Sequence, residues 1–316
     1  VRPPPPEIGA GGRSGVSFLA ELIGATLRNA TPLLYGTIGE TYSERAGILN
    51  LGIEGTMYAG AFFGFAAAAS TGSRSMGLLA AVAVGLVAGA LMGFLTVTIG
   101  TNQHVAGIGT TLGLIGISEY FNRLAFGSGE GLRRIEPYPP WEPFGADNLF
   151  SQYGLTYVGF LAIAPLAWWV LGRTHFGLNV RAVGENPEAA DAAGINVART
   201  RYAALMIGGA LMAVGGAFFT LAALGSFTLD IIVGRGWVCI ALVIFGRWRV
   251  WRGVGGALLF AAVYALQLRL RILSGFEAIP FELLLALPYL VVIAALVVSG
   301  RNVAYPGSYL KPYRRD

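Results

Sequence analysis

RAVGENPEAADAAGI, residues 181–195, is a well-punctuated polar stretch between two strongly apolar blocks, and it carries the start signals of a very short helix. Asn186 is a good N-cap because its side-chain oxygen can accept a hydrogen bond from a free backbone N–H. Pro187 suits the first helical position, where no N–H donor is needed. Glu188 and Asp191 add negative charge toward the positive end of the helix dipole. The stretch therefore predicts a helix that begins at Pro187.

The end of this helix is also marked. Gly194 can adopt the left-handed conformation that commonly follows a helix. Between the caps the apolar side chains are all alanines, so another backbone can approach closely. A membrane protein would offer such a helix to a soluble partner, but an ordinary loop helix on the membrane surface would carry the same signals. The spacing alone leaves both interpretations open.

The composition places the chain in a lipid bilayer. Hydrophobic residues make up 55% and charged residues 12%, whereas soluble domains carry roughly 25% charged residues. The mean hydropathy is +0.62. Glycine accounts for 46 of 316 residues without a three-residue period, which excludes collagen and favours close helix packing in lipid. We expect an all-α, polytopic membrane protein of about eight to ten transmembrane helices, some of them broken by glycine.

The apolar segments divide the chain into one membrane domain and two tails. We expect a flexible tail at residues 1–16, a transmembrane domain at 17–300 and a basic cytoplasmic tail at 301–316. The loop 173–201 is cytoplasmic by the positive-inside rule. Its arginines are Arg173, Arg181, Arg199 and Arg201. Arg269 falls on the outer side against this rule, so we expect it to lie inside the bundle or to pair with Glu277.

No catalytic or metal-binding motif stands out. Cys239 is the only cysteine, so no disulfide or cysteine metal site can form within one chain, and His104 and His175 are far apart. Because Lys311 is the only lysine, the chain lacks the phosphate-binding loop G-x-x-x-x-G-K-[ST] and does not hydrolyse ATP itself. We expect no enzyme, no directly bound cofactor, no metal site and no nucleic-acid partner.

Polar residues interrupt an apolar segment early in the chain. Asn50 and Glu54 lie four residues apart among Gly47, Gly52 and Gly55, which suggests a broken helix with both side chains on one face. A carboxylate in a membrane span usually faces the bundle interior or a water-filled cavity. The pair could line a transport pathway or clamp a neighbouring helix.

A second polar pair, Asn102 and Gln103, begins a later apolar segment. The glycines of this segment should loosen its helix: Gly107, Gly109, Gly113 and Gly116. A glycine-interrupted segment beside polar residues can mark a mid-membrane site, so the two amides could bind a polar substrate or simply cap the span. By contrast, Gly85, Gly89 and Gly93 repeat every four residues and predict plain helix packing.

The capped helix resembles the connecting segment of bacterial ATP-binding cassette (ABC) importer permeases, in the branch for branched-chain amino acids, simple sugars and nucleosides. The residues that match its G-E-N-P-x-A-A-x-x-x-G-I pattern are Gly184, Glu185, Asn186, Pro187, Ala189, Ala190, Gly194 and Ile195. SERAGILNLGIEG at 43–55 is similar to a signature of the nucleoside and simple-sugar permeases, and GRGW at 234–237 with ALVIFGRW at 241–248 is similar to a further block. The resemblance spans roughly residues 20–300 and is closest to the nucleoside permeases.

This resemblance implies a transporter subunit in the bacterial inner (plasma) membrane. The implied partners are a cytoplasmic ABC ATPase that uses ATP, a second and often non-identical permease subunit, an extracytoplasmic substrate-binding protein and membrane lipid. A nucleoside or related small polar solute would cross by alternating access. The residues implied to couple to the ATPase are Gly184, Glu185, Asn186, Pro187, Glu188, Ala189, Ala190, Asp191 and Gly194. The candidate substrate contacts are Asn50, Glu54, Asn102 and Gln103.

Two alternatives remain open. Within the family, a sugar or branched-chain amino acid permease would share these motifs. From another class, a secondary transporter can also have glycine-broken helices, but it would more often need buried coupling carboxylates and an inverted repeat. The sequence shows no clear internal repeat.

Overall fold

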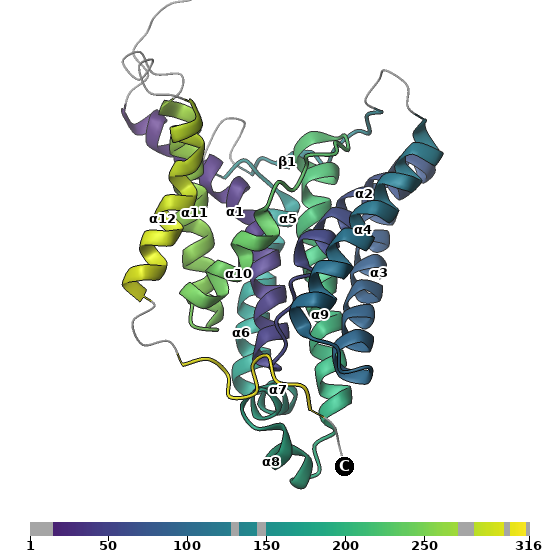
Figure 1. The fold of residues 1–316 in the computed structure, drawn as a ribbon. Coiled ribbons are helices and arrows are strands. Elements are labelled where there is room, and N and C mark those ends of the chain that lie inside the picture. Colours follow the sequence, from purple (N-terminus) through teal and green to yellow (C-terminus); the bar gives the residue numbers. More distant parts are fainter. Residues whose placement is uncertain (1–14, 128–132, 144–149, 271–280, 300–303, 314–316) are drawn as a thin grey trace, which may run out of the picture.

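The computed structural model describes residues 15–127, 133–143, 150–270, 281–299 and 304–313, which form long helices side by side (Figure 1). The helices are α1 (Gly15–Arg45), α2 (Ile53–Thr71), α3 (Arg74–Gly93), α4 (Gln103–Phe126), α5 (Gly154–Tyr157), α6 (Ala164–Arg173), α7 (His175–Glu185), α8 (Pro187–Ala192), α9 (Val197–Phe218), α10 (Arg235–Phe245), α11 (Val250–Leu270) and α12 (Phe281–Ser299). The π-helical turns are η1 (Phe94–Thr98) after α3, η2 (Val158–Ile163) between α5 and α6, and η3 (Phe219–Leu224) after α9. β1 (Pro140–Trp141) pairs antiparallel with β2 (Gln152–Tyr153).

Several helices can cross a membrane. Four stretches are long and apolar enough: Arg74–Thr98, Gly154–Arg173, Val197–Leu224 and Val250–Leu270. The long helices α1, α2 and α4 pack beside them, although polar residues and glycine lower their hydropathy. α10 and the Leu283–Val297 part of α12 are shorter apolar helices. The prediction of an all-α, polytopic membrane protein is confirmed for the described residues.

The ends of the bundle can be assigned from the arginines. α7 and α8 lie at one end, and α1 begins near the opposite end (Figure 1). The positive-inside rule makes the end with α7 and α8 cytoplasmic, so α1 enters from the outer end. The predicted tail at 1–16 lies almost entirely outside the described residues.

α9 is the central helix, and it packs against α1, α2 and α3. Glycine makes this close approach possible. A Cβ on Gly85 would overlap the carbonyl oxygen of Gly209 on α9, and one on Gly89 would overlap the carbonyl oxygen of Leu205. Gly93 faces a tyrosine ring of α9. The packing role predicted for these three glycines of α3 is confirmed.

The predicted loosening of α4 is wrong. α4 runs without interruption from Gln103 to Phe126, and a Cβ on Gly109, Gly113 or Gly116 would meet nothing within 4 Å. Glycine costs a helix interior only about 1 kcal/mol relative to alanine. In lipid, the need to satisfy every backbone group within the segment outweighs that cost.

The predicted break between α1 and α2 is present. The chain leaves helical geometry over residues 46–52, where Gly47 has the left-handed φ of +85°. Because α2 begins at Ile53, Asn50 precedes the helix and Glu54 lies in its first turn. The expectation that Asn50 and Glu54 share one helix face is therefore wrong.

Two alanine substitutions should differ in their effect on thermal stability. Gly89→Ala should lower the melting temperature by several degrees, because the new methyl group overlaps the backbone of α9. Gly113→Ala, matched in chemistry, should leave it unchanged or raise it, because alanine favours the helix by about 1 kcal/mol. Size-exclusion profiles of the detergent-solubilised variants after heating measure both. Equal melting temperatures for the two variants would contradict the close contact between α3 and α9.

Candidate coupling site and central polar contacts

The loop predicted to carry a capped helix folds as expected. Asn186 separates α7 from α8, and its Oδ1 accepts a hydrogen bond from the Ala189 N–H at 3.0 Å. Pro187 is the first residue of α8. Gly194 has a left-handed φ of +83°, and Asn196 caps the following α9. The loop that carries α8 is thus fixed by local caps at the starts of α8 and α9.

The predicted coupling residues differ in exposure, and Pro187 and Asp191 are partly buried. The exposed ones are Glu185, Asn186, Glu188, Ala189 and Gly194, together with the neighbouring Ala192 and Ala193. Ala190 is only 4% exposed and packs with Val183 and Val197. Gly184 is buried as well, because a Cβ there would overlap the carbonyl oxygen of Arg45. The alanines therefore do not form one exposed face. Ala190 and Gly184 instead pack the loop against the rest of the protein.

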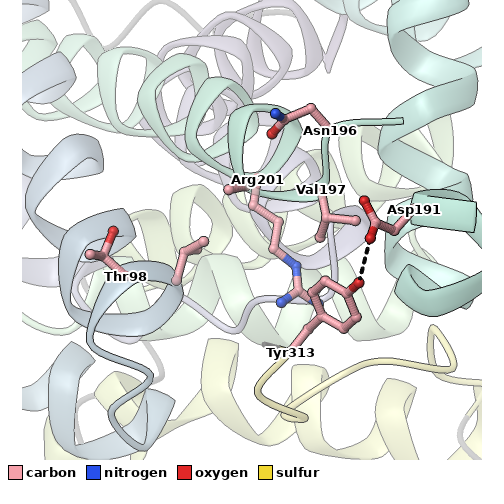
Figure 2. Close-up of a pocket in the computed structure, with 8 residues that line it drawn as sticks. Thr98, Asp191, Asn196, Val197, Arg201 and Tyr313 are labelled. Atoms are coloured by element: carbon pink, nitrogen blue, oxygen red, sulfur yellow. Dashed lines mark hydrogen bonds between the residues drawn. The ribbon is translucent and has the colours of Figure 1, made fainter. Parts of the chain in front are cut away.

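The C-terminal segment, residues 304–313, passes along the cytoplasmic end beside α7 and α8 (Figure 1). The N–H of Ser308 donates to the Gly184 carbonyl at 2.9 Å, and its buried Oγ lies 2.8 Å from the same oxygen. The Tyr313 hydroxyl donates to Asp191 Oδ2 at 3.1 Å (Figure 2). The part of the basic tail that the structure describes is therefore docked onto the loop that carries α8.

Arg201 joins this segment to the membrane domain. It lines a cavity of about 340 Å³ with Asp191, Asn196 and Tyr313 (Figure 2), yet only 1% of Arg201 is exposed. Its Nε donates to the Ala46 carbonyl at 3.2 Å, and its Nη2 lies 3.4 Å from Ser308 Oγ. The guanidinium thus connects α9, the break after α1 and the C-terminal segment.

An aromatic cluster lies beside this contact. Trp248, in the turn before α11, has its ring centroid 5.1 Å from that of Tyr305 and 6.2 Å from that of Tyr309. Its Nε1 donates to Glu44 Oε2 at 2.6 Å. Burial raises the pKa of the Tyr309 phenol, which keeps the hydroxyl protonated. The cluster ties the C-terminal segment to α1 and α11.

The break at residues 46–52 is held by side chains from other parts of the bundle. Glu40 Oε1 accepts from the Asn50 N–H at 2.9 Å, and Gln103 Oε1 accepts from the Leu49 N–H at 2.8 Å. Asn50 Oδ1 accepts from the Gly52 N–H at 3.0 Å. In lipid, backbone groups outside a helix need such partners within the protein.

Glu54 connects α2 to the start of α10. Its Oε1 accepts from the Gly234 N–H and its Oε2 from the Gly236 N–H, both at 2.7 Å. A carboxylate is a strong acceptor for the free N–H groups at a helix N-terminus. Next to it, the Gly55 N–H lies 3.4 Å from the hydroxyl of Thr111, two turns into α4. Glu54 therefore clamps a neighbouring helix inside the bundle.

Each of the four predicted substrate contacts has a structural hydrogen bond. Asn50, Glu54 and Gln103 bind backbone groups as described, and Asn102 caps α4 by accepting from the His104 N–H at 2.9 Å. Glu54 and Gln103 share no hydrogen bond, although both act near the break. That any of the four also touches a substrate stays a prediction.

Sequence reasoning gave no role to three buried residues. Glu40 and Glu44 are fully buried one turn apart on α1, and Ser308 is buried in the C-terminal segment. The four-residue spacing of Glu40 and Glu44 at the end of an apolar segment could have indicated that both lie on one buried helix face. Ser308 offered none, because its partners lie more than 100 residues away.

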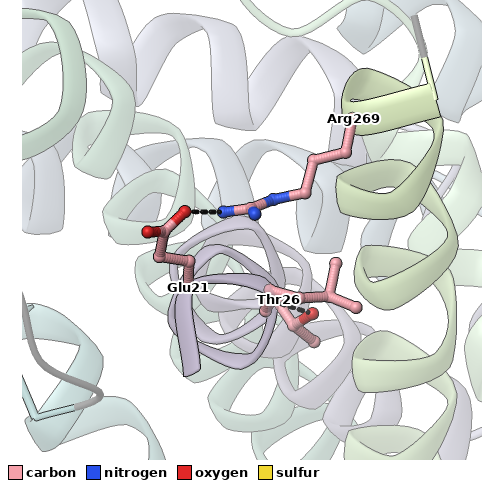
Figure 3. A network of polar contacts seen from close by, with 4 residues as sticks. Glu21, Thr26 and Arg269 are labelled. Carbon is pink, nitrogen blue, oxygen red and sulfur yellow. Dashed lines mark hydrogen bonds and ion pairs between the residues drawn. The ribbon is translucent and has the colours of Figure 1, made fainter. Parts of the chain in front are cut away.

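Arg269 is held at the outer end of the bundle. Its Nη2 lies 2.9 Å from Glu21 Oε2, which joins α11 to α1 (Figure 3). Glu277, the partner expected from the sequence, lies outside the described residues. Because both side chains are partly exposed, the ion pair adds little stability. The ion pair explains why Arg269 lies at the outer end, which the positive-inside rule disfavours for arginine.

Apolar helices, buried polar clamps and a firmly held capped helix at the basic end are the features of a multi-pass membrane protein. The model of the family described as branched-chain amino acid transport system / permease component matches residues 22–297. The chain belongs to this family.

Three relatives cover most of the chain. It is 31% identical over 294 residues to a guanosine ABC transporter permease protein of Bacillus subtilis, which covers 89% of this chain and 92% of the relative. It is 33% identical over 305 residues to a nucleoside ABC transporter permease protein of Lactococcus lactis, with 92% and 95% covered. It is 38% identical over 270 residues to a putative glucose ABC transporter permease protein of Haloferax volcanii, with 82% and 80% covered. No solved structure matches the chain.

Glu54→Gln should destabilise the protein by about 1.5–3 kcal/mol, the usual range for a hydrogen bond to a charged group. The neutral amide keeps one acceptor oxygen but turns its NH₂ toward an N–H donor of α10. Glu136→Gln, at an exposed outer position, is the control and should have no effect. Thermal unfolding of the purified variants measures the difference. A Glu54→Gln protein as stable as the control would show that the clamp on α10 is dispensable.

Proposed function

We propose that this chain is the membrane-spanning subunit of an ABC importer that moves a nucleoside, or a related small polar solute, across the inner (plasma) membrane. One observation carries the proposal: the chain is similar, over 92% and 95% of their lengths, to permeases named for guanosine and nucleosides. The family membership supports transport, and these two relatives support the substrate class.

The proposed energy source is a separate cytoplasmic ATPase, which uses ATP while this chain binds no cofactor and performs no catalysis. α8 is the proposed contact, because it projects from the cytoplasmic end with acidic and alanine side chains exposed. Its caps and the C-terminal segment hold it firmly, so a displacement of α8 moves the attached helices. A substrate-binding protein at the outer end and a second permease subunit complete the proposed assembly.

A sugar is the second candidate substrate. The relative named for glucose is 38% identical to this chain, a higher identity than either nucleoside relative has, although over a smaller share of the chain. Sugars and nucleosides both require hydrogen-bonding groups, so the polar residues near the break suit either. The distinction rests on transport measurements.

Uptake by the reconstituted transporter separates these candidates. Proteoliposomes that contain the chain with its second permease subunit, ATPase and substrate-binding protein should accumulate radiolabelled guanosine only when ATP is supplied. Excess unlabelled nucleoside should abolish this uptake, and excess glucose should not. Glucose uptake that nucleosides do not inhibit would favour the sugar candidate, and uptake without ATP would indicate a secondary transporter.

Ala192→Arg should weaken assembly with the ATPase by tenfold or more, or about 1.4 kcal/mol, because the arginine adds a steric clash and an unpaired charge to a docked surface. Ala192 is exposed on α8, whereas a large residue at the buried Ala190 would disturb packing instead. Ser70→Arg adds the same charge at the exposed outer end of α2 and is the control. Co-purification of the ATPase with each variant measures assembly. Normal recovery with Ala192→Arg would mean that α8 is a surface helix without a docking role.

A further inference from the structure

We infer that a basic pocket at the cytoplasmic membrane boundary binds the headgroup of an anionic phospholipid. The pocket has a volume of about 440 Å³ and lies where α1, α6, α7 and α11 meet. Its chemically distinctive lining residues are Arg45, Arg181, Arg249, Arg252, Trp168 and Trp251. The inference is independent of the proposed substrate and of α8 docking.

The positive charge of the pocket has no ion-pair partner among the described residues. Its lining contains no acidic residue. Among the described residues, no carboxylate lies within ion-pair distance of the four guanidinium groups. Arg45 is penalised first by its burial and then by the charges of Arg181 and Arg249, and the opposing effect of Glu185 is smaller. An anion in the pocket would relieve this repulsion.

Two of the arginines are already oriented for binding. Arg45 Nε donates to the Trp248 carbonyl at 2.9 Å, and Arg181 Nε donates to the Gly177 carbonyl at 3.3 Å. Each of these bonds uses one N–H and leaves the outer N–H groups of the guanidinium available. Arginine is suited to phosphate because its planar fork can donate two parallel hydrogen bonds.

The aromatic rim favours a lipid as the source of the phosphate. Trp168 is 45% exposed and Trp251 is 47% exposed, as expected of tryptophans at a membrane interface. Leu161 in η2 and Leu166 in α6 precede Trp168 in the chain and are 72% and 52% exposed. They offer an apolar surface to an acyl chain. Basic pockets between membrane helices on the cytoplasmic side commonly hold anionic headgroups. A soluble phosphate would use the arginines but not the apolar surface that continues from them.

A bound headgroup would act next to the coupling loop. Arg181 lies in α7, directly before α8, whereas Arg249 and Arg252 lie at the start of α11. An anion between them holds α7 and α11 together through charge-assisted hydrogen bonds. Anionic lipid would thereby stabilise the cytoplasmic end of the bundle.

Native mass spectrometry of the full-length chain tests this inference with two lipids of identical acyl chains, dioleoylphosphatidylglycerol and dioleoylphosphatidylcholine. The wild type should bind phosphatidylglycerol in preference to phosphatidylcholine. The double variant Arg249→Gln/Arg252→Gln should lose about thirtyfold in affinity for phosphatidylglycerol, given the usual contribution of each basic residue near a membrane. Arg249→Lys/Arg252→Lys keeps the charge and should retain most of the preference, which separates lost charge from misfolding.

Arg199→Gln removes an exposed arginine at the same end but outside the pocket, and it should behave as the wild type. Equal affinity of the wild type for the two lipids, or equal losses in the Arg249→Gln/Arg252→Gln and Arg199→Gln proteins, would overturn the inference. Displacement of the lipid by millimolar inorganic phosphate would show a site for a free anion instead. Displacement by the assembled ATPase would show that the pocket belongs to a protein interface.

Discussion

A backbone that leaves helical geometry inside a membrane must find its hydrogen-bond partners within the protein, and this structure depends on how that constraint is met. The break at residues 46–52 receives acceptors from Glu40 and Gln103 and a donor from Arg201. The start of α10 receives both oxygens of Glu54. The buried side chains of Glu40, Glu54 and Arg201, which would be costly if unpaired, thus bind backbone groups that have no partner within a helix. Because those partners come from different helices, each break also fixes helix positions.

This arrangement gives the cytoplasmic end a continuous set of contacts. Ser308 binds the Gly184 carbonyl just before α8, and Arg201 reaches from Ser308 to Ala46. Ala46 belongs to the break at residues 46–52, and in the same break the Asn50 N–H donates to Glu40 on α1. A displacement of α8 would therefore strain contacts on α1 and α9 together. Contact alone does not establish transmission, which requires an element with two arrangements, and the non-helical break is the part of the chain best suited to that role.

Local signals in the sequence predicted the local structure well. The caps of α8 could be predicted because Asn186 and Gly194 act within a few residues of themselves. The break before α2 was visible in its glycines, but glycine alone did not break α4, since lipid reinforces a continuous helix. The clamp formed by Glu54 was one of two interpretations of a carboxylate in a span. Its partners, 180 and 182 residues further along the chain, could not be identified from spacing.

Arginine supplies nearly all of the positive charge, and its roles separate by what surrounds each guanidinium. Arg201 is buried and binds backbone, while Arg235 lies 4.9 Å from the ring centroid of Phe219. Arg269 is paired with Glu21 at the outer end. None of these three is free to act as a topological signal in the way that the positive-inside rule assumes.

Among the described residues, exposed arginines gather in the loop around α7 and α8 and in the turn before α11, for example Arg173, Arg199 and Arg249, whereas Arg123, Arg133 and Arg134 are exposed toward the outer end. Both segments are at the same end of the bundle (Figure 1). The orientation therefore rests on the larger number of exposed arginines at this end among the described residues, and the outer position of Arg269 is explained by its ion pair with Glu21. Counting charges from sequence gave the correct grouping of loops because the buried arginines are few, whereas their structural roles depend on neighbours that only the fold brings together.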